Sequence, residues 1–378
     1  MKRVLFGAAL LVSCFGYAHG QISNDAFAAY NDAVRSGSDR SLIVAAAENL
    51  AAEAISNPDD PIAGVAAFES AWMLCVLDQC DRASQPAELA AGATDETTVS
   101  RASQSTRDLL VAYVDWKIEN TRKTRNALDT ALESLPEGDV SLVSVRAYRD
   151  YYTHCARNRR WYDAERVAKA ASEHMDSLKA DLLSEISLAK LVAISASAKA
   201  GPSMDDYESA LALERDLSAR RRELEVAGED MPEILSELEY RAMAWQNAIS
   251  AYLRSTGKRR RVDALDEAYS EDIGQSVLDE GWSEELCGGD FDFDPPLRYP
   301  RRAAYRGEVG SVIMGLSIVD GVPENIVVHA AVPDNEFGEV AKETLEKWRW
   351  IPSKGIDLTS CSMSRDNIVV PFVFQLLE

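Results

Sequence analysis

The chain has 378 residues, of which 46% are hydrophobic and 8% aromatic, so it is long enough for two or more domains with apolar cores. Its formal net charge is −22 at pH 7, from 62 acidic and 40 basic residues. This excess of negative charge argues against nucleic acid as a partner, because phosphate binding needs a basic surface.

The first 20 residues have the pattern of a secretory signal peptide. Lys2 and Arg3 precede an apolar run over residues 4–12, and small residues follow. The run is shorter than the roughly 20 residues that a membrane-spanning helix needs. An alternative stays open, because the tetrapeptide that ends at Cys14 resembles a bacterial lipobox. Either pattern predicts export to the periplasm, with membrane contact only if Cys14 is lipidated or the signal is retained.

Residues 21–270 show helical periodicity almost throughout. Apolar side chains recur at helical spacing, for example at Val65, Phe68, Trp72 and Val76. The stretch 158–171 resembles part of a tetratricopeptide-type hairpin, although no clean period of about 34 residues repeats. We therefore expect an all-α, repeat-like α-solenoid domain, with an irregular helical bundle as the alternative.

The cysteines that follow the signal segment are expected to oxidise in an exported protein. Five residues along a helix separate Cα atoms by about 8 Å, so Cys75 and Cys80 can be bridged only if the helix stops near Asp78. A bridge between Cys287 and Cys361 would tie the residues before the last domain to that domain. The odd count leaves one thiol over, which we expect to be Cys155, and sequence alone does not determine the connectivity.

The C-terminal part changes from helical to alternating periodicity. Residues 271–294 form a glycine-rich, acidic stretch that we interpret as a linker, and residues 295–378 form a separate domain. Alternation over 312–319, the turn Asp320-Gly321 and a second apolar run at 326–330 predict a β-hairpin. A helix over 336–349, stopped by Pro352, and a last strand over 368–376 complete the order β-β-α-β, a small α+β domain.

Four separated motifs run through this last domain, and each alone is typical of core packing or of a turn. They are Tyr299-Pro300, a Gly-Glu-x-Gly-x-Val sequence with Gly307 and Gly310, a Lys-Trp-Arg-Trp-Ile-Pro sequence with Trp348 and Pro352, and a terminal Val-Pro-Phe-x-Phe strand. In this order and at this spacing, the domain resembles the C-terminal domain of TonB-type energy transducers.

The resemblance implies a binding domain that carries no chemistry of its own. In that family, the TonB box, an extended peptide of outer-membrane receptors, adds as a strand to an edge of the sheet. The corresponding edge here is 367–376, where Pro371 fits because it lacks a hydrogen-bond donor. The candidate contact residues are Asn367, Ile368, Val369, Val370, Phe372 and Phe374. The alternative is that the helical domain or a second copy covers this strand.

The chain departs from full transducers in two ways, because we find neither a histidine-containing transmembrane anchor nor a Pro-rich spacer. We therefore expect a non-enzymatic periplasmic protein that binds envelope proteins, including TonB-dependent outer-membrane receptors, in connection with transport. The alternative is a periplasmic helical-repeat scaffold whose TonB-like domain serves for structural docking.

We expect neither a metal nor another cofactor. Asp290, Asp292 and Asp294 mimic the start of a calcium loop, but Pro295 and Arg301 stand where that loop needs glycine and glutamate. Zinc-ligand spacing, a phosphate-binding glycine loop and a Gly-x-Ser-x-Gly motif are all absent from the sequence.

Overall fold

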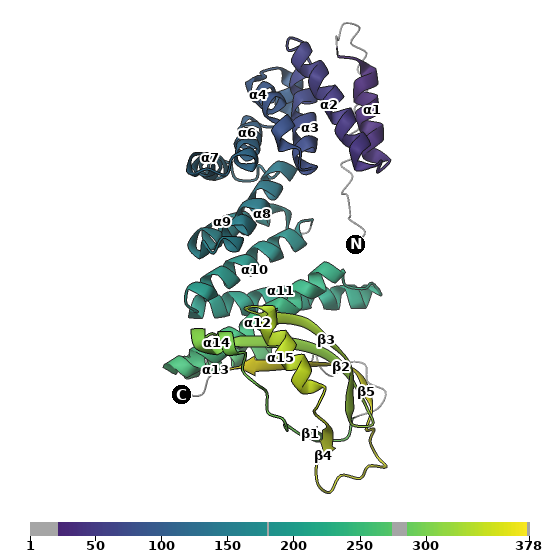
Figure 1. Ribbon diagram of the computed structural model, residues 1–378, viewed down its shortest axis with the longest axis vertical. Helices are drawn as coiled ribbons and strands as arrows, with labels where there is room; N and C mark the ends of the chain where they lie inside the picture. Colours follow the sequence, from purple (N-terminus) through teal and green to yellow (C-terminus); the bar gives the residue numbers. More distant parts are fainter. Residues whose placement is uncertain (1–21, 180, 274–285, 376–378) are drawn as a thin grey trace. The chain divides into compact units, whose positions relative to one another are not determined.

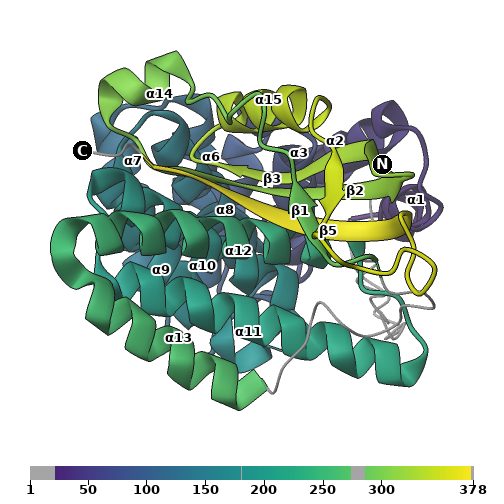
Figure 2. The same cartoon turned by 90° about the horizontal axis from the view of Figure 1, so that it is seen from below.

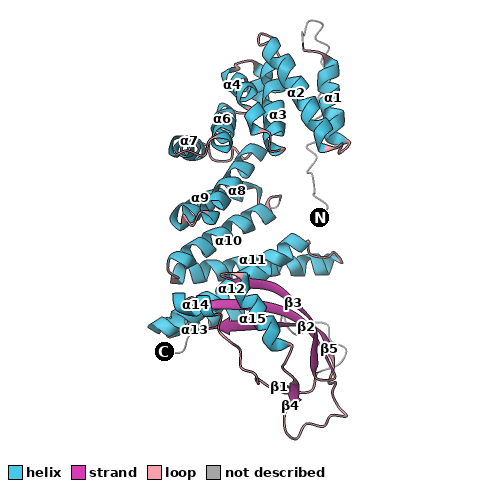
Figure 3. Cartoon of the chain, in the orientation of Figure 1, coloured by secondary structure: helices cyan, strands magenta, loops and turns pink. Residues whose placement is uncertain are grey.

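The computed structural model describes residues 22–179, 181–273 and 286–375. The predicted signal segment, with Cys14, lies outside these ranges, and so do residues 274–285 of the predicted linker. The chain divides into two compact units, residues 1–148 and 149–378 (Figure 1). Helices dominate both units, and the strands belong to the second (Figure 3). A helical N-terminal region followed by a small sheet-containing domain is thus confirmed, whereas the predicted boundaries at 20, 270 and 294 stay a prediction.

Several helices of the first unit start at side-chain caps. Asp39, Asp95 and Ser103 each accept a hydrogen bond from a backbone N–H in the first turn of the following helix. Buried alanines such as Ala47 and Ala66 allow neighbouring helices to approach closely. The elements are α1 (Asn24–Arg35), α2 (Arg40–Ser56), α3 (Ala63–Val76), η1 (Cys80–Arg82), α4 (Ser84–Gly92), α5 (Glu96–Arg101), α6 (Gln104–Ile118) and α7 (Arg122–Glu133), followed by α8 (Leu142–Arg157), which crosses into the second unit.

A disulfide closes the turn after α3. The helix ends at Val76, and Asp78 then adopts a left-handed backbone conformation with φ 55°. This turn brings the Cα atoms of Cys75 and Cys80 to 4.2 Å, and the two residues are bridged. The condition inferred from the sequence, a helix that stops near Asp78, is met. Cys155 is buried and belongs to neither disulfide of the structure.

Long helices form the first half of the second unit. They are α9 (Trp161–Met175), η2 (Asp176–Leu178), α10 (Leu183–Ala200), α11 (Met204–Ala227), α12 (Glu233–Leu253), η3 (Arg254–Lys258) and α13 (Arg259–Ile273). Helix α9 packs along α10, and α11 packs along α12. Ser203 and Asp206 form a capping box at the start of α11, and Gly228 ends this helix in the left-handed conformation. None of the helices in the described ranges is both long enough and apolar enough to span a bilayer.

The sheet of the second unit has three antiparallel strands in the order β3-β2-β5. The bounds are β2 (Gly310–Val319), β3 (Val322–Val332), α15 (Asn335–Leu345) and β5 (Arg365–Phe374), so the order β-β-α-β is confirmed. Asp320 and Gly321 both have positive φ, at 50° and 77°, as the tight turn of a β-hairpin requires.

Both faces of this sheet are covered (Figure 2). Helix α15 covers one face, where Val312 and Met314 pack with Phe337. Helix α12 covers the other face, where Ile313 and Ala330 join the apolar core of α10–α13. The alternation of side chains along β2 therefore serves two cores at once.

One expectation about this region was wrong in detail. The helix predicted over 336–349 ends at Leu345, and Pro352 lies in the short strand β4 (Trp350–Pro352) instead of stopping the helix. Part of the glycine-rich stretch before residue 295 forms β1 (Gly289–Phe291), which pairs with β4. A Cβ on Gly289 would lie 2.4 Å from the carbonyl oxygen of Ile351, so this pairing depends on glycine. Strands of three residues are too short for periodicity to reveal them.

Candidate functional site

The candidate site is the outer edge of β5. Within the described residues, β5 pairs with β2 on one side and with no strand on the other. All the residues predicted to contact a partner belong to this strand: Asn367, Ile368, Val369, Val370, Phe372 and Phe374. Figure 1 shows β5 at the margin of the sheet.

Side chains of β5 alternate between the two faces of the sheet. Phe372 and Phe374 are buried in the core under α15, so they position the strand and leave only their backbone to a partner. Val369 packs against the core of α10–α13. Pro371 is exposed, and Val373 is 42% exposed. The accessible part of the site is thus the backbone rim together with these two side chains.

The regular part of β5 carries no charge. Residues 368–374 are all apolar, and the strand is irregular only before Ile368, where Asn367 has φ 55° and the pairing register with β2 shifts. Edge strands are usually blunted by charges or bulges that discourage pairing with another chain. The seven residues of this rim carry neither a charge nor a bulge, and Pro371 is the one blunting feature among them, which removes a single donor and leaves the rest of the edge open to a partner.

The opposite edge, β3, is irregular by comparison. The register with β2 shifts twice, once next to Ile313 and once next to Gly315. Asn325 lies in the second irregular stretch with φ 52°, and Glu324 beside it is exposed. Bulges of this kind twist an edge and interrupt its pairing. Of the two margins of the sheet, β5 is therefore the better template for an added strand.

Aromatic packing fixes the position of β5 from the α15 side. Trp348 is buried, and its Nε1–H donates a hydrogen bond of 2.7 Å to the carbonyl oxygen of Pro295. Its ring centroid lies 5.6 Å from that of Phe372 and 4.8 Å from that of Phe293, which meets it edge-on. Trp348 thus joins the segment before the domain to β5, although it follows α15 instead of lying within it.

The other motif residues shape the same core. The Tyr299 hydroxyl donates a hydrogen bond to the carbonyl oxygen of Glu308, and burial raises the pKa of Tyr299. Its ring meets those of Phe337 and Phe374 edge-on. A Cβ on Gly310 would lie 2.5 Å from the Phe337 ring, so only glycine fits at the start of β2.

Two further motif residues delimit the short helix α14 (Arg301–Arg306). Pro300 immediately precedes its first residue. Gly307 ends it in the left-handed conformation with φ 63°, which favours glycine. The helix turns the chain into β2, so these residues act on the architecture and not on a ligand.

A second disulfide ties the segment before the domain to the sheet. Cys287 and Cys361 are bridged with Cα atoms 4.9 Å apart. The N–H of Cys287 donates to the carbonyl of Ser362 at 2.8 Å, and the Trp350 indole N–H donates to the carbonyl of Cys287 at 2.9 Å. Residues 286–294 are therefore held against the domain in the part that the structure describes.

The contact of the sheet with α12 is a feature that the sequence did not reveal. The ring of His329 on β3 stacks on Tyr240 of α12, with centroids 4.3 Å apart and planes 12° from parallel. Gly315 on β2 leaves room for this ring, and burial lowers the pKa of His329. A glycine inside a strand often marks a close approach, so Gly315 was the available signal.

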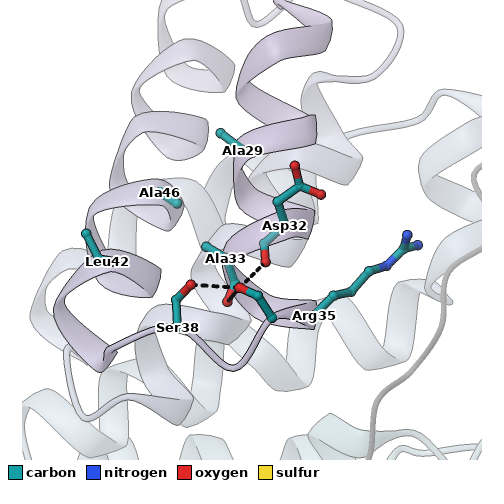
Figure 4. A pocket seen from close by; sticks show the side chains of 8 residues that line it. Ala29, Asp32, Ala33, Arg35, Ser38, Leu42 and Ala46 are labelled. Atoms are coloured by element: carbon teal, nitrogen blue, oxygen red, sulfur yellow. Dashed lines mark hydrogen bonds between the residues drawn. The ribbon is translucent and has the colours of Figure 1, made fainter.

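A shallow groove lies elsewhere on the surface. It lies between α1 and α2 in the first unit and is lined largely by small or apolar side chains, including Ala29, Leu42 and Ala46 (Figure 4). The Ser36 hydroxyl donates to the carbonyl of Asp32 at 2.6 Å, so it is used in capping α1. Across the described ranges, the structure has no group of three or more histidine, cysteine or acidic residues that could hold a metal ion.

The match to a known family decides the nature of the last domain. The family model of the Gram-negative bacterial TonB protein C-terminal matches residues 295–374, less than half of the chain. Residues 295–374 are a TonB C-terminal domain. This domain includes β2, β3, α15 and β5. No curated protein matches the chain.

The TonB C-terminal domain gives the chain a coarse functional context. The family belongs to the envelope of Gram-negative bacteria, is connected with transport and acts through contacts between proteins. The candidate edge β5 lies inside the matched range.

Proposed function

We propose that this chain is a non-enzymatic periplasmic TonB-like protein that binds envelope proteins by strand addition to β5. The observation that carries the proposal is a regular, apolar edge strand inside a TonB C-terminal domain, with no strand on its outer side among the described residues. Main-chain hydrogen bonds would supply affinity, and the side chains on the two faces would supply selectivity.

Pro371 indicates which backbone groups face outward. It lies opposite Ile313 of β2, in a register that is continuous from Ile368 to Phe374. Because proline has no N–H, its nitrogen is best placed on the outer side, where β2 loses no hydrogen bond. By alternation, Val369 and Val373 then also direct their N–H and C=O groups outward. A partner strand would meet two donors along this rim, the N–H groups of Val369 and Val373. It would also meet three acceptors, the carbonyl groups of these two residues and of Pro371.

The partners we propose are TonB-dependent outer-membrane receptors, through an extended segment of the TonB-box kind. The apolar rim favours a segment that is itself extended, apolar and free of proline where the rim offers a carbonyl acceptor. The acidic charge of the chain, −22 in total, disfavours segments flanked by many acidic residues.

Export places this binding activity in the periplasm. The proposal includes cleavage of the signal segment after Gly20; the chain would contact a membrane only in the alternative cases, lipidation at Cys14 or retention of the signal. Helices form the described part of the chain that precedes the TonB C-terminal domain, so we propose an adaptor.

A second candidate function is favoured by one contact. Helix α12 covers the face of the sheet opposite α15, so the TonB C-terminal domain is docked within its own chain. A periplasmic scaffold in which this domain has a structural role would use the same contact. The two functions differ in whether the outer rim of β5 binds a foreign strand.

Peptide binding to the full chain distinguishes the two. A fluorescent TonB-box peptide is titrated into the protein, and Val373→Pro, which removes one outward N–H, is compared with the unchanged chain. Loss of one hydrogen bond of about 1 kcal/mol weakens binding about fivefold. Val328→Pro on the opposite edge β3 is the control, because Val328 lies opposite Met314 and by the same alternation directs its N–H outward; it should leave affinity unchanged. Absence of binding by the unchanged chain favours the scaffold, and an equal loss in the control refutes β5 as the docking edge.

A further inference from the structure

A cluster of ionisable side chains is buried between α11 and α12, away from the edge of β5. Glu214 and Ser218 lie on α11, and Glu239 lies on α12; they are 8%, 1% and 2% exposed. The Ser218 Oγ is 3.1 Å from Oε1 of Glu214 and 2.9 Å from Oε1 of Glu239. Arg221 completes the cluster, with its Nε 3.0 Å from Oε2 of Glu239 and a second contact from its guanidinium.

The hydrogen bonds can be satisfied in only one protonation state. The Ser218 hydroxyl carries a single proton and lies between two carboxyl groups, so it can donate to only one of them. Glu239 is ion-paired with Arg221 and is therefore the ionised acceptor. Glu214 then completes the chain only as a neutral acid that donates its own proton to Ser218. The Oε2 atom of Glu214 is buried without a hydrogen-bond partner in the described structure. An ionised Glu214 would therefore place a second, poorly solvated negative charge here, which is energetically costly.

We propose that Glu214, Ser218, Glu239 and Arg221 form a proton-operated latch between α11 and α12. With Glu214 protonated, the hydrogen bonds run continuously from Glu214 through Ser218 and Glu239 to Arg221, and the two helices are joined. Loss of that proton puts a second negative charge beside Glu239 and leaves Ser218 with two acceptors for one hydrogen. The packing of α11 on α12 is weakened as a result.

The latch reaches the TonB C-terminal domain through α12. Glu239 faces α11, whereas the adjacent Tyr240 stacks on His329 of the sheet. The same helix contributes Trp245 and Ala248 to the core that Ile313 of β2 shares. A change in how α12 is held against α11 therefore acts on the support of the sheet, independently of whether β5 binds a partner.

The charged groups around Glu214 favour its neutral form. Burial, followed by the charge of Glu239 on α12, raises the pKa of Glu214 to about 7, although Ser218 and Arg222 on its own helix act in the opposite direction. From α10, the ammonium of Lys190 is directed to Asp216. No ion pair joins Glu214 to a cation of the described residues.

The sign of the pH effect follows from these values. The folded chain holds the Glu214 proton up to about pH 7, whereas the unfolded chain releases it near the ordinary value of 4.5. The folded state thus binds more protons between these values, and stability is lost as the pH rises. From pH 6 to pH 8, the equilibrium constant for opening of α11 and α12 should increase about tenfold.

Hydrogen exchange measured on the full chain at pH 6, 7 and 8, corrected for the intrinsic rate, tests the latch. In peptides from α11 and α12, the increase in opening from pH 6 to pH 8 should be about tenfold larger for the unchanged chain than for Glu214→Gln. Glu208→Gln, on an exposed site of the same helix, is the matched control and should behave like the unchanged chain. Other titrating groups, including His329, cancel in this comparison.

Infrared difference spectra give a second measurement that does not depend on stability. The C=O band of a protonated carboxylic acid should be present at pH 6, disappear by pH 8 and be missing in Glu214→Gln. The proposal is overturned if the unchanged chain and Glu214→Gln show the same pH dependence of opening, or if that band is absent at pH 6.

Discussion

Replacement of Gly315 by alanine tests the contact between α12 and the TonB C-terminal domain. Alanine normally stabilises a strand interior by about 0.5–1 kcal/mol relative to glycine, because it has less backbone entropy to lose. Here a Cβ would lie 2.3 Å from Nε2 of His329 and 3.1–3.2 Å from two carbons of the ring. Carbon and nitrogen atoms in favourable contact are about 3.5–4 Å apart.

The ring cannot move away without cost, because His329 stacks on Tyr240 with centroids 4.3 Å apart. Overpacking of this kind costs about 1–3 kcal/mol, and loss of the stack costs a further 0.5–1.5 kcal/mol or so. We therefore expect Gly315→Ala to destabilise the second unit by about 1–3 kcal/mol, opposite in sign to its effect on an unobstructed strand.

Urea unfolding followed by circular dichroism measures this change, and hydrogen exchange in α12 locates it. The control is a double-mutant cycle with His329→Ala, which removes the obstructing ring. In that background, Gly315→Ala should be neutral or stabilising by up to about 1 kcal/mol. A cost that is equal in both backgrounds, or a stabilisation by Gly315→Ala alone, would refute the proposed packing of α12 on the sheet.

Two further predictions concern the α15 side of the sheet. Trp348→Ala should destabilise the domain by about 3–5 kcal/mol because it leaves a cavity in the core. Trp348→Phe should cost about 1–3 kcal/mol because the carbonyl of Pro295 loses its hydrogen-bond donor. Equal denaturation midpoints for the two variants would contradict this difference between them. Replacing Cys287 and Cys361 together by serine opens a loop closed across 74 residues and should cost up to about 4 kcal/mol. Thermal melting with and without reductant checks this value, and the doubly substituted chain should no longer respond to reduction of that bridge.

The arrangement of the TonB C-terminal domain could be predicted because several local signals agree. The Asp320-Gly321 turn needs positive φ at both positions, and a large apolar residue recurs at every second position from Val312 to Ile318. The motif residues Trp348 and Gly310 both have packing roles in the core: the Trp348 ring is buried there, and a Cβ at Gly310 would overlap the Phe337 ring. Exclusion of proline from the inner side of a ladder likewise indicated that the strand with Pro371 is peripheral.

Strands β1 and β4 and the end of α15 left only weak signals in the sequence. Strands β1 and β4 have three residues each, which is below the length at which periodicity can be recognised. Their pairing depends on the close approach that Gly289 allows and on the disulfide from Cys287 to Cys361, neither of which local propensity encodes. The end of α15 at Leu345 was missed for a related reason, because the following turn still places the apolar Trp348 toward the core.

The amino-acid sequence by itself determined the helical nature of the first part, the β-β-α-β order of the last part and the position of the last strand at an edge of the sheet, because all three depend on side-chain period and on residues with restricted backbones. Only the tertiary structure decided that α12 forms a third layer against the sheet, and that Glu214 and Glu239 meet in its interior. The apolar stripe of a helix shows that it will be buried, but not against which surface. Which helix covers the sheet is settled by the fit of particular side chains, such as Tyr240 against His329 above Gly315.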